Sequence, residues 1–223
     1  MYKQISFNYI AIVLFTFFLS LQTAFSQDLK SGIVQYKIEY SGKAVDSSLV
    51  AFLPTRMIMT FNKRYVKEEI LGTKNPNVIV KDFKERISYF LVVISDSQKF
   101  AITSRFEDAP IAIKDSAMII RTNKTKDISG FLAYQVTCIQ KQDTSDIFYI
   151  PLKNCEWAKN YLFNGVNGIV SDYMFMNNEM NIRFSIISIE RKKLNFETFR
   201  IPDEYKMIEK TAFEKLRNAT QIE

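Results

Sequence analysis

The sequence predicts a mainly β protein: a single curved antiparallel sheet, forming an incomplete barrel, packed on a C-terminal amphipathic helix. Apolar and polar residues alternate over residues 33–40, which is typical of a strand with one buried face. Short segments of this kind recur at spacings of about ten residues, as in sandwiches and barrels. No linker rich in Gly, Ser or Pro interrupts the chain. Residues 27–223 are therefore predicted to form one β-rich, half-barrel-like domain.

The predicted strands end at turn-forming residues such as Gly, Asn, Asp and Pro. In chain order they cover residues 33–40, 49–53, 57–61, 64–71, 78–82, 87–94, 99–103, 131–140, 146–150, 169–176, 182–189 and 196–201. Residues 112–120 fit either a strand or a short helical turn, and residues 152–163, with the only tryptophan, fit a short helix. This order of short strands argues against βαβ units and a parallel sheet.

The C-terminal segment changes to a helical period, with apolar residues on one face and Lys and Glu elsewhere. The apolar residues are Tyr205, Ile208, Ala212, Phe213 and Leu216. Asp203 and Glu204 precede all of them, at a position where acidic side chains favour the start of a helix. We therefore expect one helix that packs its apolar face on the sheet.

The N-terminus has the order of a secretory signal peptide. Lys3 precedes an apolar run over residues 5–21, and the small residues Ala24 and Ser26 flank Phe25 before Gln27. Residues 1–26 are therefore predicted to form a signal helix that is cleaved near Ser26, which places the protein in the periplasm or outside the cell. The alternative is an uncleaved membrane anchor, for which the apolar run is close to the minimum length.

Histidine is absent from all 223 residues. This excludes Ser-His-Asp and Cys-His catalysis and the histidine-based metallopeptidases. Only two cysteines could supply thiolate ligands, so we predict no metal, no cofactor and no catalytic residue. The acidic pair Glu68 and Glu69 lies in a predicted strand, where neighbouring side chains point to opposite faces and cannot share one site.

The chain has a formal net charge of +6, with its basic residues dispersed. The densest groups are residues 63–64 and 191–193, and neither forms the single basic face of a nucleic-acid-binding protein. We predict no nucleic-acid partner and interpret the charge as a solvated surface, leaving a weak attraction to anionic lipid head groups open.

The two cysteines, Cys138 and Cys155, lie in a chain predicted to reach an oxidising compartment. A hairpin between residues 131–140 and 146–151 would place Cys138 opposite about Tyr149. Cys155 would then lie six residues further along, roughly 20 Å away, whereas a disulfide needs Cα atoms within about 7 Å. The geometry disfavours a Cys138–Cys155 disulfide, although a chain that folds back after Pro151 would permit it.

Methionine and aromatic side chains are abundant, with 8 Met, 19 Phe and 11 Tyr. They either fill the core or, if the sheet wraps incompletely around the terminal helix, line a cavity for a lipid-like ligand. The methionines concerned are Met57, Met59, Met118, Met174, Met176 and Met180. The sequence leaves both alternatives open and identifies no ligand-binding residue.

Four spaced motifs resemble a known family. They are Ser31 to Tyr36, Ile128 to Cys138, Phe163 to Val170 and Phe199 to Tyr205. Their order is similar to that of the secreted GLPGLI family of Bacteroidetes-type envelope proteins. Gly165 to Val170 occupies the position of the naming motif, with Val166 and Asn167 in place of its Leu and Pro. The resemblance implies a fold like the half-barrel of periplasmic lipoprotein carriers and carries over no catalytic residue.

The Gly165 to Gly168 element lacks the Lys-Ser/Thr ending of a phosphate-binding loop, so we interpret it as a structural turn in which glycine supplies positive φ. We expect a non-enzymatic, monomeric periplasmic protein that binds a hydrophobic ligand or lipoprotein segment in cell-envelope maintenance. The alternative is an interaction module that docks another envelope protein through an exposed sheet face or edge. An enzyme using carboxylates, Tyr or Lys is the third hypothesis.

Overall fold

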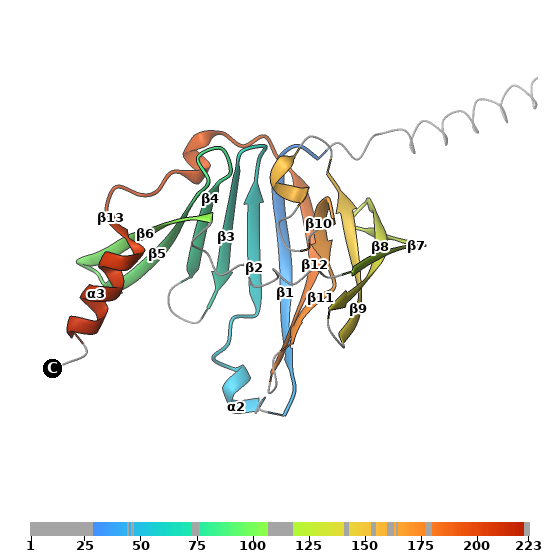
Figure 1. The fold of residues 1–223 in the computed structure, drawn as a ribbon, viewed down its shortest axis with the longest axis horizontal. Helices are drawn as coiled ribbons and strands as arrows, with labels where there is room; N and C mark the ends of the chain where they lie inside the picture. The colour runs from blue at the N-terminus through green and yellow to red at the C-terminus, as the bar shows by residue number, and fades with distance from the viewer. Residues whose placement is uncertain are drawn as a thin grey trace, which may run out of the picture.

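A computed structural model describes most of the chain after the predicted signal peptide. The described residues are 29–43, 45, 47–72, 76–106, 118–140, 143–152, 155–159, 163, 165–176 and 180–220. They are mainly β and form large curved sheets that do not close into a barrel (Figure 1). The predicted signal peptide and most of residues 112–120 lie outside the described residues. Within the described ranges, no helix is long and apolar enough to span a bilayer.

Among the described residues, the larger sheet has nine strands, and its neighbouring pairs are antiparallel except at one edge. Across the sheet the order is β11 (Tyr173–Met176), β12 (Asn181–Arg191), β1 (Gly32–Ser41), β2 (Arg56–Phe61), β3 (Tyr65–Leu71), β4 (Asn77–Asp82), β5 (Ile87–Ser95), β6 (Gln98–Arg105) and β13 (Lys206–Glu209). The strand β13 pairs in parallel with β6. The run from β1 to β6 is an antiparallel meander. Short turns close the hairpins from β2 to β6, whereas a longer segment, residues 42–55, connects β1 to β2.

A second sheet has four strands within the described ranges, so the prediction of a single sheet is wrong. Its order is β10 (Gly168–Ser171), β9 (Asp143–Pro151), β8 (Phe131–Gln140) and β7 (Met118–Ile128). The expected strand over residues 169–176 is divided between the two sheets, as β10 and β11. The division occurs at Asp172, whose φ of 58° turns the chain from one sheet to the other.

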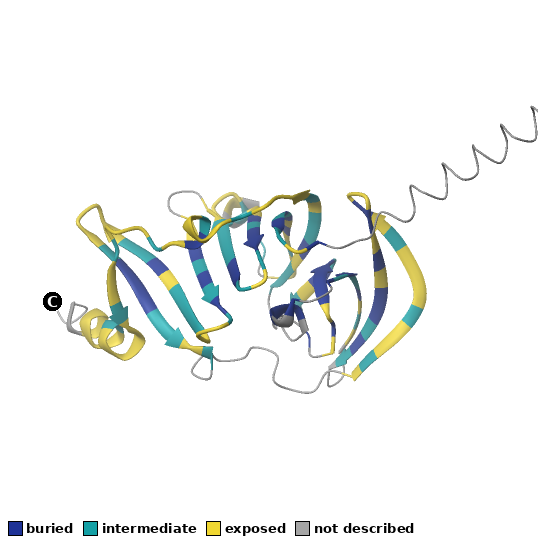
Figure 2. Cartoon of the chain, turned by 90° about the horizontal axis from the view of Figure 1, so that it is seen from above, coloured by how far each residue is buried: buried dark blue, intermediate teal, exposed yellow. Residues whose placement is uncertain are grey.

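The main core lies between the four-stranded sheet and one half of the nine-stranded sheet, and Figure 2 shows buried segments on both. We call the side of the nine-stranded sheet that faces the smaller sheet its inner face. Its fully buried side chains include Tyr36, Met59 and Phe61, which meet Ile147 and Ile150 of β9. The sequence left open whether the methionines fill the core or line a cavity. Met57 and Met59 fill the core.

A strap, residues 192–205, covers the opposite, outer face of β3 to β6. The strap contains the 3₁₀ helix η3 (Phe196–Phe199), in place of the strand expected over residues 196–201. Phe199 is 2% exposed and stacks on Tyr65 with ring centroids 5.3 Å apart. The strand prediction is wrong because the apolar residues of this segment pack on the sheet from outside and do not extend it.

The terminal helix α3 (Lys210–Thr220) begins later than the apolar period suggested, because Ile208 belongs to β13. Phe213 contacts Phe100 of β6 at a centroid distance of 5.7 Å, while most other described side chains of the helix are exposed. The helix therefore lies at one edge of the nine-stranded sheet (Figure 1) and does not cover the rest of the sheet. The smaller sheet and the strap provide the cover that the helix was expected to give.

Two short segments complete the described chain. The helix α2 (Ser47–Val50) replaces part of the strand expected over residues 49–53, because a short apolar run does not distinguish strand from helix by period. The 3₁₀ helix η2 (Glu156–Lys159) confirms the short helix expected within residues 152–163. In η2, Trp157 is 3% exposed, and its indole N–H donates to the carbonyl of Asn62 at 2.9 Å.

Candidate functional site

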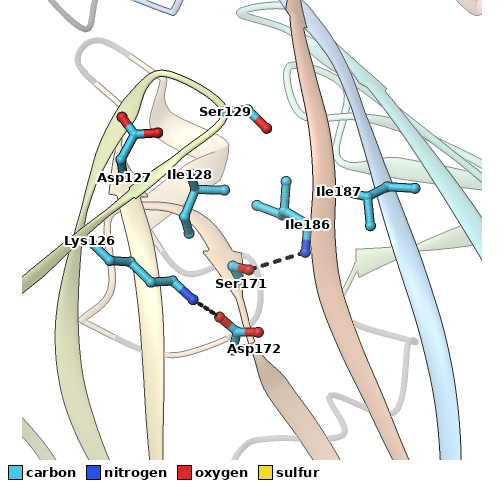
Figure 3. Close-up of a pocket in the computed structure, with 8 residues that line it drawn as sticks. All are labelled: Lys126, Asp127, Ile128, Ser129, Ser171, Asp172, Ile186 and Ile187. Carbon is cyan, nitrogen blue, oxygen red and sulfur yellow. Dashed lines mark hydrogen bonds and ion pairs between the residues drawn. The ribbon is translucent and has the colours of Figure 1, made fainter.

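A polar depression lies where the chain passes from one sheet to the other (Figure 3). It has a volume of about 290 Å³. Its lining comes from β7, from the β10–β11 corner and from β12: Lys126, Asp127, Ile128, Ser129, Ser171, Asp172, Ile186 and Ile187. Sequence analysis missed this site, because residues 126 and 172 become neighbours only when the two sheets pack.

Asp172 is the centre of this depression and has several partners. Its carboxylate accepts a hydrogen bond from Lys126 Nζ and a second from Ser185 Oγ at 2.9 Å, and Arg183 Nη2 lies 3.6 Å away. Burial disfavours the charged carboxylate, but the hydrogen bonds from Lys126 and Ser185 and the nearby positive charges outweigh this effect. The pKa of Asp172 is therefore below its ordinary value.

The same corner is fixed by two further contacts. Ser171 Oγ accepts a hydrogen bond from the backbone N–H of Ile186 at 3.1 Å. Lys126 Nζ lies 4.4 Å from the centroid of the Phe148 ring. A carboxylate with a lowered pKa, occupied by hydrogen-bond donors, is poorly suited to act as a general acid. This geometry joins the two sheets and supports a structural role.

Glu68 and Glu69 lie on opposite faces of β3, as predicted. Glu68 is paired in register with Ile79 and Glu69 with Val78. Each carboxylate has its own lysine: Lys81 Nζ is 2.9 Å from Glu68, and Lys67 Nζ is 3.0 Å from Glu69. These ion pairs separate the two acids and do not form a catalytic carboxylate pair.

Asp203 and Glu204 were expected at the start of the terminal helix, but they lie in the turn before β13. Asp203 accepts from Arg200 at 2.8 Å, and Glu204 lies 3.8 Å from Lys99. The expectation is wrong because β13 separates this turn from the helix, so the helix dipole does not explain the two acids.

Cys138 and Cys155 are both buried, and neither forms a disulfide. Cys138 is paired with Ser145 and not with the region of Tyr149 that was expected. The register differs because β9 already begins at Asp143, which pairs with Gln140. Burial, with a smaller effect from the charge of Asp146, raises the pKa of Cys138 to about 11.

The Gly165 to Gly168 element precedes β10 and has two different backbone requirements. Gly165 has a positive φ of 87°, as expected for this turn. Gly168 is constrained by close approach, because a Cβ atom there would lie 2.2 Å from the carbonyl oxygen of Ile150. The element is therefore a structural turn that lets β10 pair with β9.

An open apolar face occupies the part of the nine-stranded sheet beyond the main core. Strand register places Ile79 beside Phe90 and Phe90 beside Ile102, and places Val92 beside Phe100. These five side chains lie on the inner face, because Ile79 is also paired with Glu68, two residues from the core residue Val66. We use the name "open apolar face" for Ile79, Phe90, Val92, Phe100 and Ile102.

Exposure varies across the open apolar face. Phe100 and Ile102 are buried, Ile79 and Val92 are half-buried, and Phe90 is 38% exposed. The Glu68–Lys81 ion pair lies at its boundary with the main core. The sequence predicted strands over residues 78–82, 87–94 and 99–103, but it could not show which stretch of the inner face is left uncovered by the smaller sheet.

An acidic and aromatic group lies on the core side of this boundary. Tyr36 Oη donates to the carbonyl of Val170 at 3.1 Å. Burial and the charge of Glu68 raise the pKa of Tyr36, and burial with the neighbouring Tyr36 and Glu68 raises that of Tyr173. Both phenols therefore stay neutral across the physiological range.

Within the described ranges, no group of three Cys, Asp or Glu side chains is arranged to hold a metal ion.

Comparison with known proteins gives no family for the chain. No family model matches the sequence, and no curated protein matches it. Among solved structures, PNGF-II in one crystal form has a TM-score of 0.48 at 12% identity and covers 83% of this chain and 32% of that chain. PNGF-II in a second crystal form has a TM-score of 0.48 at 10% identity and covers 84% and 33%.

A LolA superfamily protein from Nitrosomonas europaea is also similar, with a TM-score of 0.36 at 10% identity over 78% of this chain and 91% of that chain. The chain spans about a third of the length of the PNGF-II chains it matches. At these TM-scores and identities, the similarities decide neither the family nor the function.

Proposed function

We propose that the protein is a non-catalytic binding protein of the cell envelope that holds an apolar chain, such as an acyl chain or a lipoprotein segment, on the open apolar face. The observation that carries this proposal is the unequal covering of one sheet face. The inner face is buried beneath the smaller sheet around Met59 and Phe61, whereas Phe90 remains 38% exposed farther along the same face.

The exposed part of the face consists of apolar side chains. Phe90 and its neighbours Ile79 and Val92 project from adjacent strands on one side, so their side chains form a continuous surface. Contiguous exposed apolar surface of this kind marks binding sites in proteins that fold in water. Burying the exposed part of one such aromatic side chain is worth on the order of 1 kcal/mol.

The binding mode follows from the shape of the described surface. Two depressions on this surface are lined largely by polar or charged side chains. An apolar ligand would therefore lie along the sheet and be only partly enclosed. Lys81 and Glu68 at the boundary of the face would favour a ligand with a polar end, as a fatty acid or an acylated peptide has.

Delipidated protein titrated with cis-parinaric acid, a fluorescent fatty acid, tests this proposal. Replacement Phe90→Ser should weaken binding about tenfold, because it removes the exposed ring from the centre of the face. Phe52→Ser is the matched control: Phe52 is 72% exposed after α2 and lies outside the open apolar face, so affinity should not change. Equal affinity of the Phe90→Ser variant and the wild type, or no uptake by the wild type, would overturn the proposal.

A second candidate function is docking of an envelope protein on the edge strand β7. This strand pairs only with β8 within the described sheets, and its Met118 and Ile120 are 62% and 42% exposed. An extended segment could add to this edge. Arg121 is paired with Val136, whose backbone groups bond β9, so the Arg121 N–H points away from β8. Arg121→Pro would therefore block a backbone hydrogen bond at the edge and should abolish crosslinking to a bound partner, whereas Phe52→Ser should not. Unchanged crosslinking of the proline variant would contradict edge docking.

A further inference from the structure

Basic side chains from distant parts of the sequence meet at one end of the nine-stranded sheet. Gly32 at the start of β1 is paired with Arg191 at the end of β12 and with Phe61 at the end of β2. The backbone N–H of Phe83, just after β4, donates to the carbonyl of Arg64 at the start of β3. These pairings bring together a group that we call the basic rim: Lys30, Lys63, Lys84, Arg86, Lys192 and Lys193.

Backbone contacts hold the part of the rim formed by β1 and β12. Ser31 Oγ donates to the carbonyl of Lys192 at 2.7 Å, and the Lys192 N–H donates to the Ser31 carbonyl at 3.4 Å. A depression of about 230 Å³ lies between the two segments. It is lined by Leu29, Lys30, Ser31, Arg191, Lys192 and Lys193. In Figure 1 this is the end at which the chain enters β1.

Most of the positive charge at this end is not neutralised. Lys63, Lys84, Lys192 and Lys193 are exposed and form no ion pair within the described ranges. The acids on the same strand ends are Asp82, Glu85 and Glu190. Two of these acids already pair with Arg64, at 2.5 Å for Asp82 and 3.5 Å for Glu85. The rim therefore presents several exposed positive charges to solvent.

An exposed aromatic side chain accompanies the rim. Phe196 follows Lys192 and Lys193 by only a few residues in the strap and is 56% exposed. Its ring lies 5.7 Å from that of Tyr65, at the start of β3, so it belongs to the same end of the sheet. Lysines beside an exposed aromatic ring are the composition of surfaces that bind the head-group region of anionic membranes.

We propose that the basic rim docks the protein on a bilayer that contains anionic phospholipid, with Phe196 inserting among the head groups. Charge complementarity favours this partner, because several exposed lysines meet many phosphates at once. A single exposed ring fits a bilayer better than single-stranded nucleic acid, which is bound by several stacking side chains. The rim shares no residue with the open apolar face, so this inference stands or falls separately from the proposed function.

Cosedimentation with vesicles tests the inference. The protein is purified from the envelope of the expressing cell, so that it has the N-terminus that is present after export. Vesicles contain either equal parts of phosphatidylglycerol and phosphatidylcholine or phosphatidylcholine alone. We expect binding only to the anionic vesicles, and we expect it to weaken as salt screens the charges.

Charge-reversal variants locate the surface. The rim variant is Lys63→Glu, Lys192→Glu, Lys193→Glu, and each lost lysine should weaken binding about fivefold, at least about a hundredfold in total. The control variant carries the same charge change on the far edge: Lys206→Glu, Lys210→Glu, Lys215→Glu, all exposed. It should keep affinity within a few-fold of the wild type. Trp157 fluorescence reports that each variant is folded, since this indole is buried in the main core.

Four results would overturn the inference. They are equal binding to phosphatidylcholine vesicles, equal losses in the rim and control variants, and tighter binding of duplex DNA than of anionic vesicles with the same dependence on the rim. The fourth is displacement by inorganic phosphate at an ionic strength where sodium chloride has no effect, because this would indicate a discrete anion site and not a membrane-docking surface.

Discussion

Replacing Asp172 with asparagine should destabilise the corner that joins the two sheets. The substitution keeps the shape of the side chain and suits the positive φ of 58°, which asparagine tolerates well. It removes the negative charge that accepts from Lys126 and Ser185 and attracts Arg183. The change therefore isolates the charge of this carboxylate from its packing and backbone conformation.

The expected loss follows from the burial of the partners. The Asp172 side chain is 15% exposed, whereas that of Lys126 is 40% exposed. Breaking a fully buried pair costs about 3–5 kcal/mol, but solvent screens this half-exposed lysine. We therefore expect the free energy of unfolding to fall by about 2 kcal/mol. For a chain of this size, that corresponds to a decrease in Tm of about 4–8 °C.

Urea denaturation followed by Trp157 fluorescence measures this difference, since Trp157 lies in the core that the corner encloses. The folded-state pKa of Asp172 is lowered, so its contribution is complete above the ordinary value of about 3.9 and is lost as pH falls through the lowered pKa. The gap between wild type and variant should be full near pH 7 and should close below about pH 4.

The matched control is Asp127→Asn, at the edge of the same depression. Asp127 is exposed and accepts from the backbone N–H of Gly130 at 3.0 Å. Its replacement should cost well under about 1 kcal/mol. If Asp172→Asn unfolds at the same urea concentration as the wild type, or if the gap persists at low pH, the carboxylate does not act as described.

Three further outcomes test the packing. Gly168→Ala should lower the free energy of unfolding by about 3 kcal/mol in urea denaturation, because its Cβ would lie 2.2 Å from the carbonyl oxygen of Ile150. The control Gly130→Ala, at a φ of 80° with open space around it, should cost only about 1–2 kcal/mol. A larger loss for Gly130→Ala than for Gly168→Ala would contradict the register of β10. Cys138, with a pKa raised to about 11 by burial, should resist iodoacetamide near pH 8 until urea unfolds the chain. The contribution of the neutral thiol to stability is complete below about pH 8.5 and is lost as pH rises through about 11. Rapid labelling of the folded protein would show that the thiol is accessible. Phe199→Ala should cost about 3–5 kcal/mol in thermal unfolding, because the ring is 2% exposed between the strap and the outer face. An unchanged Tm would show that the strap does not hold the outer face.

Sequence reasoning worked well where neighbouring strands are also neighbours in the chain. The strands from β1 to β6 were predicted, apart from the additional strand wrongly expected over residues 49–53, because residues 33–40 alternate cleanly and the hairpins from β2 to β6 close through short turns. The same local logic correctly separated Glu68 and Glu69 onto opposite faces. Such features need only the two-residue period of a strand.

Sequence reasoning failed where a distant contact decides the conformation. Residues 169–176 read as one apolar strand, but Asp172 divides it in response to Lys126, which is 46 residues away. Residues 196–201 also read as a strand, yet Phe199 packs against Tyr65 from outside the sheet. In both cases the apolar residues were identified correctly, while the surface that covers them was not.

The candidate sites show the same division. The lysines of the basic rim could be counted in the sequence, but Lys30 and Lys192 become neighbours only through the pairing of β1 with β12. Likewise, the strand around Phe90 was predicted, but the exposure of Phe90 depends on where the smaller sheet ends.

The sequence by itself determined the strand-rich architecture, the positions of most strands, the absence of histidine chemistry and the prediction of export. It could do so because these properties depend on composition and on periods of a few residues. Tertiary structure decided that there are two sheets, that the helix lies at an edge, and which apolar and basic side chains face solvent. These outcomes depend on pairings between segments far apart in the chain, and a local pattern of apolar residues does not specify its partner.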